Sequence, residues 1–594
     1  MHTSSTEVLI VGAGPTGLTM ACELLRRGVM CRILDKTDTP ALTSRAIGLQ
    51  ARTLEVFANM GIVEPILQQG IPGIKVNAYQ GDHLLFHLDF HFLATDAIPY
   101  PYGVLVPQNL TEQTLLDLLK QRGGQVERSR EVIELRSERE QVIVSIKNLQ
   151  GGTDEEIVAK WVIGCDGAHS RIRQAGGFLF EGSTYREAFL LADVDLDWQR
   201  SRDEVHVWIH QDGQFGVFPL PDNRWRLMAD IAVLPGVPVP DASLELFKRL
   251  MCERTGDATT TISHPTWMSN FQIHRRLART FRNGRVFLAG DAAHVHSPFG
   301  GQGASTGIQD AFNLAWKLAL VLHGKADEFL LDTYQEERRP VARQVLSSAH
   351  VLTSIFYRRN ALMRLLRDHV VVPLLERPAI QRRLLWAASE LGIQYRSSTL
   401  SRGHRRGLRT LLPGTRKAIQ AGDRAPDGHC LGLPRREETT LFHIFQDPRA
   451  HLLLFDGSIQ TSDTYRYLLQ VAQRTQSLLN EVIQVHLVVS SQMELAWEGS
   501  LLYDVDHQLH VHYGMRVPSL AFIRPDGYIG LLCPLARDQE LLEYLHHLYL
   551  FPHVGRTLSE TATAGEAKIR DNLLPRSHEA QVIQKGDPGH GTYA

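Results

Sequence analysis

Apolar and polar positions follow strand-like and helix-like patterns in turn at the start of the chain. Residues 7–11 form a short apolar run that ends in glycines, residues 15–27 carry apolar side chains at helical spacing, and residues 29–34 form a second apolar run. This order predicts a strand, a helix and a second strand, the opening of a βαβ unit. A helical pattern at residues 111–121 and a strand pattern at residues 161–164 follow. The beginning of the chain is therefore typical of an α/β domain.

Between residues 189 and 233 the pattern changes to short strands, among them residues 204–209 and 226–232. Turn-forming residues at 211–213 and 221–223 separate these strands. Short strands joined by tight turns indicate an antiparallel sheet. We therefore predict that an antiparallel sheet is inserted between two parts of the first domain.

The helical pattern returns after the predicted sheet. A buried strand at residues 285–289 precedes a long apolar helix at 304–323 and a mostly helical stretch at 332–367. Residues 413–434 are rich in Gly, Pro and Arg and indicate a linker. The segment beyond it predicts strands at 451–455, 482–490, 519–524 and 528–532 and helices at 462–473 and 539–548. This order predicts a second α/β unit that ends in a hairpin around the turn Pro525-Asp526-Gly527.

Composition and charge exclude several classes of protein. The 594 residues are 43% hydrophobic and 22% charged, which excludes a disordered chain or a fibre. The net charge of −2 gives no field that would favour nucleic acid or an anionic membrane. Six cysteines without a CxxC pair indicate neither a disulfide framework nor a zinc site. Glycines and Pro15 interrupt the apolar stretch 8–25, so we expect no membrane span and a cytoplasmic protein.

Three glycines form the first motif that carries chemistry. Gly12-x-Gly14-x-x-Gly17 directly follows the first predicted strand and opens the first predicted helix. In a dinucleotide site the first glycine makes the tight turn, the second lets a pyrophosphate approach the backbone, and the third lets helix and strand pack closely. Asp35 ends the second strand, 23 residues after Gly12, where a carboxylate accepts a hydrogen bond from a ribose hydroxyl. Together these residues predict a dinucleotide-binding unit.

The second motif lies far along the chain, in residues 285–317. An apolar strand ends in Gly290-Asp291, and a glycine-containing turn at residues 300–305 precedes a long helix. Asp291 can bind a polyol there, and the amides of the turn point at a ligand beyond the N-terminus of the helix. A flavin meets both demands, because its ribityl chain is a polyol and its N1 and O2 edge becomes negative on reduction.

Three motifs together resemble the FAD-dependent aromatic hydroxylase family, which includes p-hydroxybenzoate hydroxylase, phenol hydroxylase and aromatic polyketide hydroxylases. They are the glycine motif, Gly290-Asp291 with its following helix, and the stretch Cys165-Asp166-Gly167-Ala168-His169-Ser170-Arg171-Ile172-Arg173. The resemblance covers about residues 7–345. It implies an α/β fold in which a Rossmann-like FAD-binding domain carries an inserted antiparallel substrate sheet and is followed by a C-terminal thioredoxin-like domain.

These expectations divide the chain as follows. The FAD-binding domain takes residues 1–188 and, with a helical segment, 281–412; the substrate sheet takes 189–280, the linker 413–434, the thioredoxin-like domain 435–554 and a tail 555–594. Residues 455–464, where a redox dithiol would lie, contain no cysteine, so we expect a structural or dimer-supporting domain. Val517-Pro518 resembles the proline of that fold, for which a cis peptide bond is one possibility.

The cofactor-binding residues that the resemblance implies come from all three motifs and their neighbours. They are Gly12, Gly14, Pro15, Thr16, Gly17, Asp35, Lys36, Arg45, Gln108, Val132, Asp166, Asp291, Pro298, Gly301, Gly303, Ala304 and Ser305. The glycine motif holds the pyrophosphate, Asp35 binds the adenosine ribose, and the backbone of Val132 contacts adenine. Arg45 and Gln108 match family positions that contact the cofactor. Asp166 is associated with both FAD and the nicotinamide donor.

At the flavin end, the resemblance implies that Asp291 binds the ribityl chain and that Pro298 lies near the reactive face of the ring. The amides of Gly303 and Ala304 lie near the pyrimidine edge. The family commonly has a large apolar residue and Asn where this chain has Ala304 and Ser305. The backbone contact survives this change, whereas the Asn side-chain contact does not. No catalytic side chain is identified.

The implied activity is that of a monooxygenase. Reduced FAD, formed with NADPH or NADH, reacts with O2 to give a C4a-hydroperoxide, which transfers oxygen to a phenolic or polycyclic aromatic substrate. A Baeyer–Villiger or epoxidising enzyme on the same fold and a non-catalytic flavin-binding protein remain alternatives, and a homodimer is left open. A halogenase is not expected, because no two Trp residues are separated by one position.

Large side chains of the predicted sheet are candidates for the substrate pocket. They are Trp208, Phe215, Phe218, Trp225, Met228 and Trp267. His294 and His296 form a pattern that can bind a metal, but no third ligand accompanies them. We therefore expect no metal site.

Overall fold

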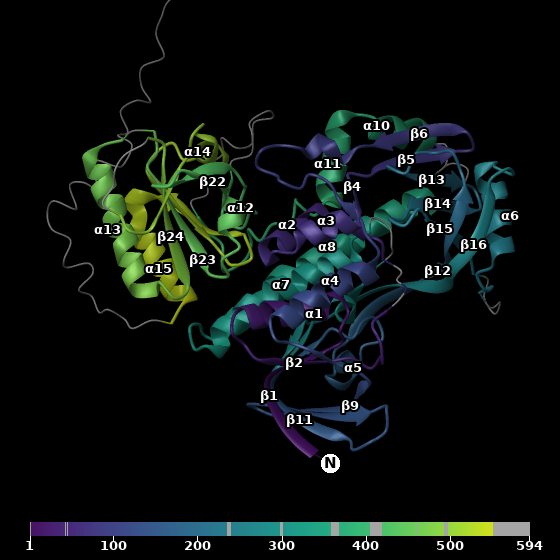
Figure 1. Cartoon of the computed structure of the whole chain (residues 1–594), viewed down its shortest axis with the longest axis horizontal. Coiled ribbons are helices and arrows are strands. Elements are labelled where there is room, and N and C mark those ends of the chain that lie inside the picture. The colour runs from purple at the N-terminus through teal and green to yellow at the C-terminus, as the bar shows by residue number, and fades with distance from the viewer. Residues whose placement is uncertain are drawn as a thin grey trace, which may run out of the picture.

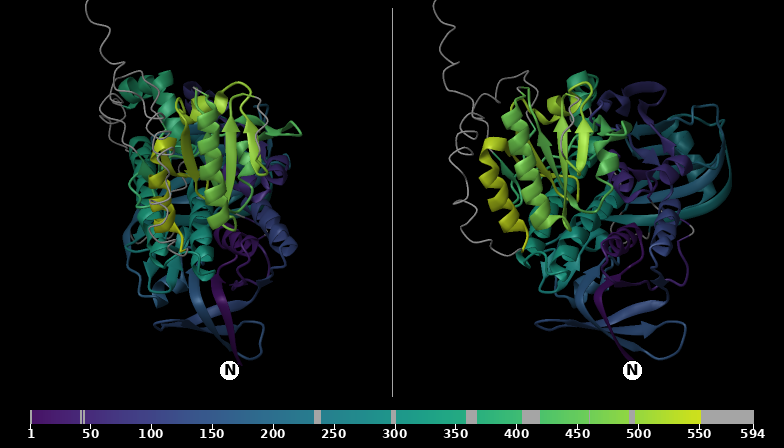
Figure 2. Two further views of the ribbon diagram at one scale, coloured as in Figure 1. Left: turned by 90° about the vertical axis from the view of Figure 1, so that its left-hand side faces the viewer. Right: turned by 60° about the vertical axis from the view of Figure 1, so that its left-hand side comes forward.

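Three regions make up the computed structural model, which describes residues 2–41, 43, 46–233, 239–296, 301–357, 367–403, 419–458, 460–491 and 497–550. A first sheet with its helices lies in the centre, a second sheet extends to one side, and the C-terminal domain lies on the other (Figure 1). Figure 2 shows the same arrangement with the C-terminal domain in front. Arg45, Pro298 and the predicted tail 555–594 lie outside the described residues.

The first sheet has the order β17-β18-β11-β1-β2-β8, with β10 paired to β11 and β9 to β10. Its strands are β1 (His2–Val11), β2 (Cys31–Leu34), β8 (Val126–Glu127), β9 (Arg130–Ser137), β10 (Val142–Asn148), β11 (Glu155–Gly164), β17 (Arg282–Asn283) and β18 (Val286–Leu288). β1 is parallel to β2 and β11. Residues 8–10 are fully buried in succession, as a parallel sheet covered on both faces requires. The predicted α/β class is confirmed.

Helices and a small three-stranded sheet surround this core. They are α1 (Pro15–Arg26), α2 (Ala51–Met60), α3 (Val63–Gln69), α4 (Gln108–Gln121), α5 (Arg171–Ala175), α7 (Gly303–Leu322), α8 (Phe329–Tyr357), β3 (Gly48–Leu49), β4 (Ile71–Pro72) and β7 (Val104–Leu105). α1 begins within the first glycine motif, at Pro15, and α7 begins at Gly303, within the glycine-containing stretch 300–305 of the sequence. None of the helices in the described ranges has the length and apolar character that a membrane crossing requires.

The second sheet has the order β19-β16-β12-β15-β14-β13-β5-β6. Its strands are β5 (Lys75–Gln80), β6 (His83–Leu88), β12 (Phe180–Asp197), β13 (Glu204–His210), β14 (Gly213–Pro219), β15 (Trp225–Ala232), β16 (Thr261–Ala278) and β19 (His294–Val295); α6 (Leu244–Thr255), α10 (Val372–Leu375) and α11 (Pro378–Ala388) accompany it. β5 and β6 belong to this sheet by their hydrogen bonds, although their residues lie in the stretch 1–188 that we assigned to the first domain. The other domain boundaries remain predictions.

The C-terminal sheet has the order β20-β27-β26-β23-β24-β25-β21-β22. Its elements are β20 (Arg402–Gly403), β21 (His429–Leu433), β22 (Glu437–Thr440), α12 (Leu441–Ile444), β23 (Ala450–Phe455), α13 (Ser462–Leu479), β24 (Ile483–Val489), β25 (Ser500–Tyr503), α14 (Gln508–Tyr513), β26 (Ser519–Ile523), β27 (Ile529–Pro534) and α15 (Asp538–Leu548). β21 lies within the predicted linker 413–434. β23 is parallel to β24 and antiparallel to β26. The Val517–Pro518 bond, for which cis was one possibility, is trans, and the cis peptide bond found among the described residues is Leu433–Pro434.

Alternation along β23 divides the C-terminal core into two layers. Leu452 and Leu454 pack with side chains of α13 and α15, while Leu453 and Phe455 pack with side chains of α12 and α14. This period of two is what a central strand with two covered faces requires. The sheet is therefore covered on both sides.

A buried ionic cluster lies where β23 ends. The His510 imidazole donates through Nε2 to Asp456 Oδ1 at 2.9 Å and through Nδ1 to Asp504 Oδ2 at 2.8 Å. Burial alone would lower the pKa of His510, but the hydrogen bonds to Asp456 and Asp504 outweigh it and raise this pKa to about 9. The side chain is therefore an imidazolium at neutral pH.

We expect this cluster to make stability pH-dependent on the alkaline side. A raised pKa contributes stability fully below the ordinary value of 6.5, and the contribution is lost as pH rises through about 9. The unfolding temperature, followed by differential scanning calorimetry between pH 7 and 10, should fall more steeply for the wild type than for His510→Gln. His429→Gln, at an exposed position, is the matched control. Parallel slopes for the wild type and His510→Gln would contradict the assignment.

Candidate functional site

The two glycine motifs meet where α1 packs against α7. Thr16, in the first turn of α1, lies against Gly290 and Gly307. A Cβ atom at Gly290 would lie 2.6 Å from Thr16 Oγ1, and one at Gly307 would overlap the same oxygen. Gly290 also has a φ of +62°, which other residues rarely adopt. Only glycine fits at both positions, and the close approach joins the start of α1 to the Gly290-Asp291 turn.

Each glycine of the first motif has a different surrounding. A Cβ atom at Gly12 would overlap the carbonyl of Cys165, and one at Gly17 would overlap the carbonyl of Gly12. Gly14 instead faces open space, with Glu112 Oε1 as its nearest neighbour at 4.0 Å. The first and third glycines are required for packing, whereas the second leaves room that a ligand can occupy.

Asp35 lies at the back of this loop. Its Oδ2 accepts a hydrogen bond from the Ala13 amide at 2.6 Å, and its Oδ1 accepts one from the Thr37 amide at 2.8 Å. The Arg130 amide donates to the Asp35 carbonyl at 2.9 Å, so the start of β9 lies beside the end of β2. Val132 is buried two residues further along β9. The predicted adenosine-binding residues therefore lie around one strand end.

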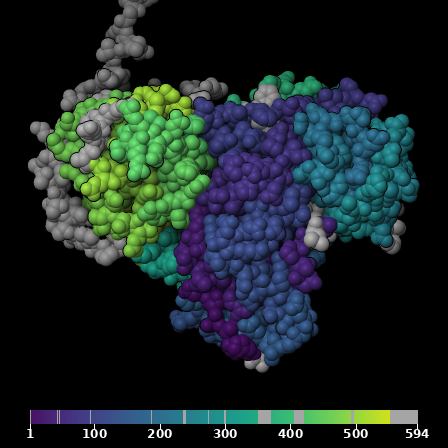
Figure 3. Space-filling model, in the orientation of Figure 1, coloured from purple at the N-terminus to yellow at the C-terminus, as the bar shows by residue number. Residues whose placement is uncertain are grey.

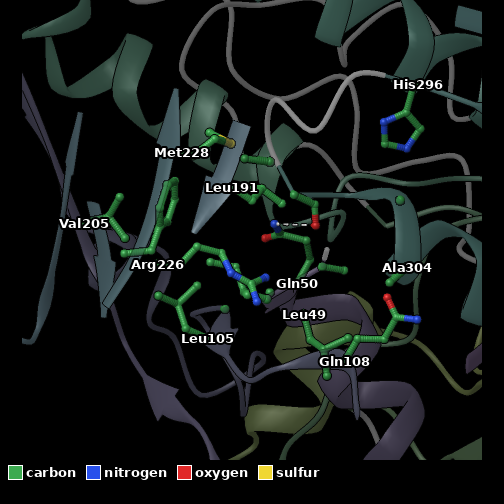
Figure 4. Close-up of a pocket in the computed structure, with 18 of the residues that line it drawn as sticks. Leu49, Gln50, Leu105, Gln108, Leu191, Val205, Arg226, Met228, His296 and Ala304 are labelled. Carbon is green, nitrogen blue, oxygen red and sulfur yellow. Dashed lines mark hydrogen bonds between the residues drawn. The ribbon is translucent and has the colours of Figure 1, made fainter. Parts of the chain in front are cut away.

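A cavity of about 1050 Å³ lies between these loops and the second sheet. The predicted residues that line it are Gly14, Pro15, Thr16, Gln108, Asp291, Gly301, Gly303 and Ala304. The predicted residues Gly12, Gly17, Asp35, Lys36, Val132, Asp166 and Ser305 do not line it. Figure 4 shows Gln108 and Ala304 near one another at one side of the cavity.

The start of α7 and Asp291 give this side of the cavity its polar character. The Asp291 carboxylate is exposed toward the cavity and has no hydrogen-bond partner among the described residues. α7 begins at Gly303, and the first amides of a helix have no partner within the helix. The positive end of the helix therefore faces the cavity through Gly303 and Ala304. A ligand with hydroxyl groups and a partly negative edge fits these groups.

Ser305 and Asp166 shape the site without lining it. The Ser305 hydroxyl accepts from the Gln50 amide at 3.0 Å and so fixes the loop before α2. Asp166 accepts from the Ser170 hydroxyl at 2.5 Å and from the Arg171 amide at 2.6 Å, at the N-terminus of α5. Burial raises the pKa of the Asp166 carboxyl. The direct cofactor contact expected for Asp166 stays a prediction.

The second sheet forms the opposite wall, and its alternation decides which side chains reach the cavity. Phe218 and Met228 line it, whereas Trp208, Phe215 and Trp225 pack with α6 on the other face. Trp267, the sixth pocket candidate predicted from size and residue type, does not line the cavity. Its ring lies against the Arg226 guanidinium. Residues that were not predicted also line the cavity: Leu49, Gln50, Leu105, Leu191, Val205, Val207, Ile209, Gln214, Arg226, Leu384 and Leu385. The alternating pattern of β13 was a signal for three of them.

Arg226 is the charged side chain of this wall. Its guanidinium donates through Nε to Asp193 Oδ1 at 2.7 Å and through Nη2 to Asp193 Oδ2 at 2.8 Å. In Figure 4 the side chain extends from the sheet toward Gln50. The side-chain Nε2 of Gln50 in turn donates to the Gly301 carbonyl at 3.5 Å, the dashed line of that view. A guanidinium paired with a carboxylate is therefore part of the sheet wall that faces the cavity.

Buried charges support the Gly290-Asp291 turn from behind. Asp310 on α7 accepts from the Gly290 amide at 3.1 Å, from His294 Nε2 at 2.6 Å and from Arg338 Nε at 2.7 Å. Burial alone would raise the pKa of Asp310, but Arg338 and His294 lower it. His294 is thus occupied by a carboxylate, while His296 lines the cavity. The two histidines of the turn therefore lie in different surroundings, His294 beside Asp310 and His296 at the cavity.

The loop after α11 ties the remaining wall to α7. Gln302 Nε2 donates to the Ala387 carbonyl at 3.1 Å, and the Glu390 carboxyl accepts from the Thr306 hydroxyl at 3.0 Å. Burial raises the pKa of Glu390 to about 7. Leu384 and Leu385 of α11 reach the cavity from this anchored position.

Comparison with known proteins finds relatives that match most of the chain. Residues 5–349 match the family described as FAD binding domain. The chain is 33% identical over 557 residues to 6-methylpretetramide 4-monooxygenase of Streptomyces rimosus, covering 92% of this chain and 94% of that protein. It is 32% identical over 553 residues to pentachlorophenol 4-monooxygenase of Sphingobium chlorophenolicum, covering 91% and 96%. The crystal structure of CabE, an aromatic hydroxylase from angucycline biosynthesis, aligns with a TM-score of 0.71 at 28% identity, covering 92% of this chain and 100% of that chain.

Fold and site together define a flavoprotein in which a dinucleotide-binding domain shares one cavity with a second sheet. The open space at Gly14 and the carboxylate of Asp291 fit FAD. The chain belongs to the FAD-dependent aromatic hydroxylase family. It is an FAD-dependent monooxygenase, as the sequence predicted.

We expect Asp291→Ala to weaken FAD binding. A hydroxyl group of the cofactor would lose a charged acceptor, which corresponds to about 1.5 to 3 kcal/mol and thus to about 10- to 150-fold in Kd. Titration of the apoprotein with FAD, followed by flavin fluorescence, measures the change. Asp117→Ala, on the exposed face of α4, is the matched control. An unchanged Kd for Asp291→Ala would remove this carboxylate from the site.

Proposed function

We propose that the protein hydroxylates a phenolic or polycyclic aromatic substrate with FAD, a nicotinamide donor and O2. The observation that carries the proposal is one continuous cavity, which runs from the glycine loops to an apolar wall of the second sheet. Relatives named as monooxygenases of a pretetramide and of pentachlorophenol support this substrate class. An aromatic ring bound against Met228 and Phe218 would lie between that wall and the start of α7.

The loops of the first domain would hold the cofactor along its length. Gly14 and Pro15 would contact the pyrophosphate, Asp35 the adenosine ribose and Asp291 the ribityl chain. The amides at the start of α7 would face the pyrimidine edge and stabilise negative charge there. Bound FAD supplies the activation of O2, while the protein supplies the position and the dry surroundings. The cofactor contacts that the resemblance implies for Arg45 and Pro298, which lie outside the described residues, remain part of the proposal.

Arg226 would bias the substrate toward its reactive form. A guanidinium at the edge of an apolar cavity favours a phenolate over a phenol, because the anion gains a charged partner. Asp193 holds two of its nitrogens and fixes the direction of the side chain. A phenolate is more electron-rich than a phenol and accepts an electrophilic oxygen more readily. Arg226 therefore contributes both orientation and activation in this proposal.

NADPH or NADH would reduce the flavin from outside, because FAD occupies the dinucleotide fold of the first sheet. Baeyer–Villiger or epoxidising chemistry would use the same FAD, nicotinamide donor and O2, and would differ in the substrate group that receives the oxygen atom. A flavin-binding protein without turnover differs in consuming no nicotinamide donor.

Six free cysteines are compatible with a reducing, cytoplasmic location, and a homodimer stays a prediction.

We also propose that the C-terminal domain is a thioredoxin-like domain without redox function. The neighbouring strands β24, β23, β26 and β27, with β23 and β24 parallel and the other pairs antiparallel, support this relation. Asp456 follows β23 where a redox dithiol would lie. Its pairing with His510 indicates a structural role for that position.

A turnover assay with a panel of simple phenols and polycyclic quinones tests the function. We expect at least one aromatic compound to accelerate NADPH or NADH oxidation several-fold and to gain one oxygen atom, identified as ¹⁸O by mass spectrometry under ¹⁸O₂. Aromatic compounds that fit poorly should accelerate oxidation but release peroxide. Product with oxygen inserted beside a carbonyl would instead identify Baeyer–Villiger chemistry. Absence of donor oxidation with every compound and both donors would favour a non-catalytic protein.

Arg226→Gln should separate substrate binding from cofactor binding. With an identified phenolic substrate we expect KM to rise about tenfold and the pH optimum to move upward, because the phenolate loses its charged partner. FAD affinity should stay unchanged. Arg224→Gln, on the exposed turn before β15, serves as the control, and Asp193→Asn combined with Arg226→Gln removes the orphaned carboxylate. An unchanged KM and pH profile in the double variant would contradict the role.

A further inference from the structure

The turn between β26 and β27 of the C-terminal domain inserts between α7 and α8. Arg524 donates to both carboxylate oxygens of Glu337 on α8, at 2.5 and 2.9 Å. It also donates through Nε to Asp526 Oδ1 at 3.0 Å within the turn. The side chains of Arg524 and Glu337 are fully buried. In Figure 3 the C-terminal domain directly abuts the first domain in that view.

Polar side chains of α7 complete this cluster. Asp526 Oδ2 accepts from Asn313 Nδ2 at 3.1 Å and from the Trp316 indole at 3.2 Å. Lys317 Nζ donates to Glu337 at 2.7 Å. Burial lowers the pKa of Lys317 to about 8, although Glu337 opposes this shift. Two cations and two carboxylates balance one another, and none of the four side chains is more than 2% exposed, so removing one leaves an uncompensated charge.

A second contact of the same turn connects it to the first turn of α7. The Tyr528 ring packs on the Tyr395 ring, with 4.2 Å between centroids. The Tyr395 hydroxyl accepts from Arg338 Nη1 at 2.9 Å. Arg338 Nη2 donates to the Thr306 carbonyl in the first turn of α7 at 3.1 Å, and its Nε donates to Asp310. The path from the turn therefore reaches the helix start.

A third contact runs through α2. The Asp526 carbonyl accepts from Arg52 Nη2 at 2.8 Å, and the Arg52 guanidinium also lies over the Tyr528 ring at 4.9 Å. Arg52 lies two residues beyond Gln50, whose amide donates to Ser305. Each of the three contacts ends on α7 or on a loop bonded to its first turn.

We propose that this turn positions the start of α7, so that FAD affinity depends on the C-terminal domain. α7 is one continuous helix that carries Gly303 and Ala304 at one end and Asn313 and Trp316 in its middle. A helix transmits an axial shift along its length with little deformation. Loss of the contacts in the middle would therefore move the amides at its start relative to Asp291. The inference rests on the proposed placement of the flavin.

FAD titration of apoprotein variants tests the inference at a temperature where far-UV circular dichroism shows each variant folded. Asp526→Asn and Tyr528→Ala are the test variants. Tyr528→Phe keeps the ring and loses a hydroxyl that has no hydrogen-bond partner among the described residues. Leu545→Ala lowers the stability of the C-terminal core at a position on α15, outside the turn itself. Both of these are controls.

We expect the two test variants to raise the Kd for FAD about tenfold or more and to shift the visible spectrum of the bound flavin. Tyr528→Phe should bind FAD like the wild type, and Leu545→Ala should lower only the unfolding temperature. Wild-type affinity and spectrum in Asp526→Asn would overturn the inference, even if Tyr528→Ala fails to fold. Asp291→Ala in the same titration distinguishes failure of this inference from failure of the proposed flavin placement. If it weakens binding while the turn variants do not, the inference alone fails; if it has no effect either, the flavin placement is wrong.

Discussion

The close contact of Thr16 with Gly290 and Gly307 is the constraint on which the site depends. Two segments far apart in the chain can form one cofactor site only if α1 and α7 approach closely, and any side chain at either glycine prevents this. The contact aligns the open space at Gly14 with the carboxylate of Asp291. It also aims the start of α7 at the cavity, so a few missing Cβ atoms determine where an anionic ligand with hydroxyl groups can bind.

Charge burial determines how the rest of the molecule supports this contact. Asp310 and Arg338 fix the Gly290 turn, and each compensates the buried charge of the other. Arg524 and Asp526 complete a similar balance with Glu337 and Lys317. Without the C-terminal domain, Glu337 would lose the two hydrogen bonds from Arg524, and the polar groups of Asn313 and Trp316 would lose their acceptor Asp526. The C-terminal domain is therefore part of the electrostatic structure of the core in this chain.

The elements and the glycine sites could be predicted because they depend on local pattern. Apolar periodicity located β1, α1, β2 and α7, and steric limits on glycine marked both loops. The face of a side chain on the second sheet could not be predicted from residue type. Trp208 and Trp225 have the size expected of a pocket, yet alternation turns them toward α6. The wall from α11 and the pairing of Arg226 with Asp193 depend on long-range contacts that no local pattern records.

A crystal structure of the protein with FAD tests the central claim most directly, that the glycine-packed helices create one flavin site opening onto the second sheet. The account predicts density for the pyrophosphate at Gly14, for the ribityl chain at Asp291 and for the pyrimidine edge at the Gly303 and Ala304 amides. One face of the isoalloxazine ring should then lie opposite Met228 across the cavity. FAD bound elsewhere, or an isoalloxazine ring that does not reach this cavity, would contradict it.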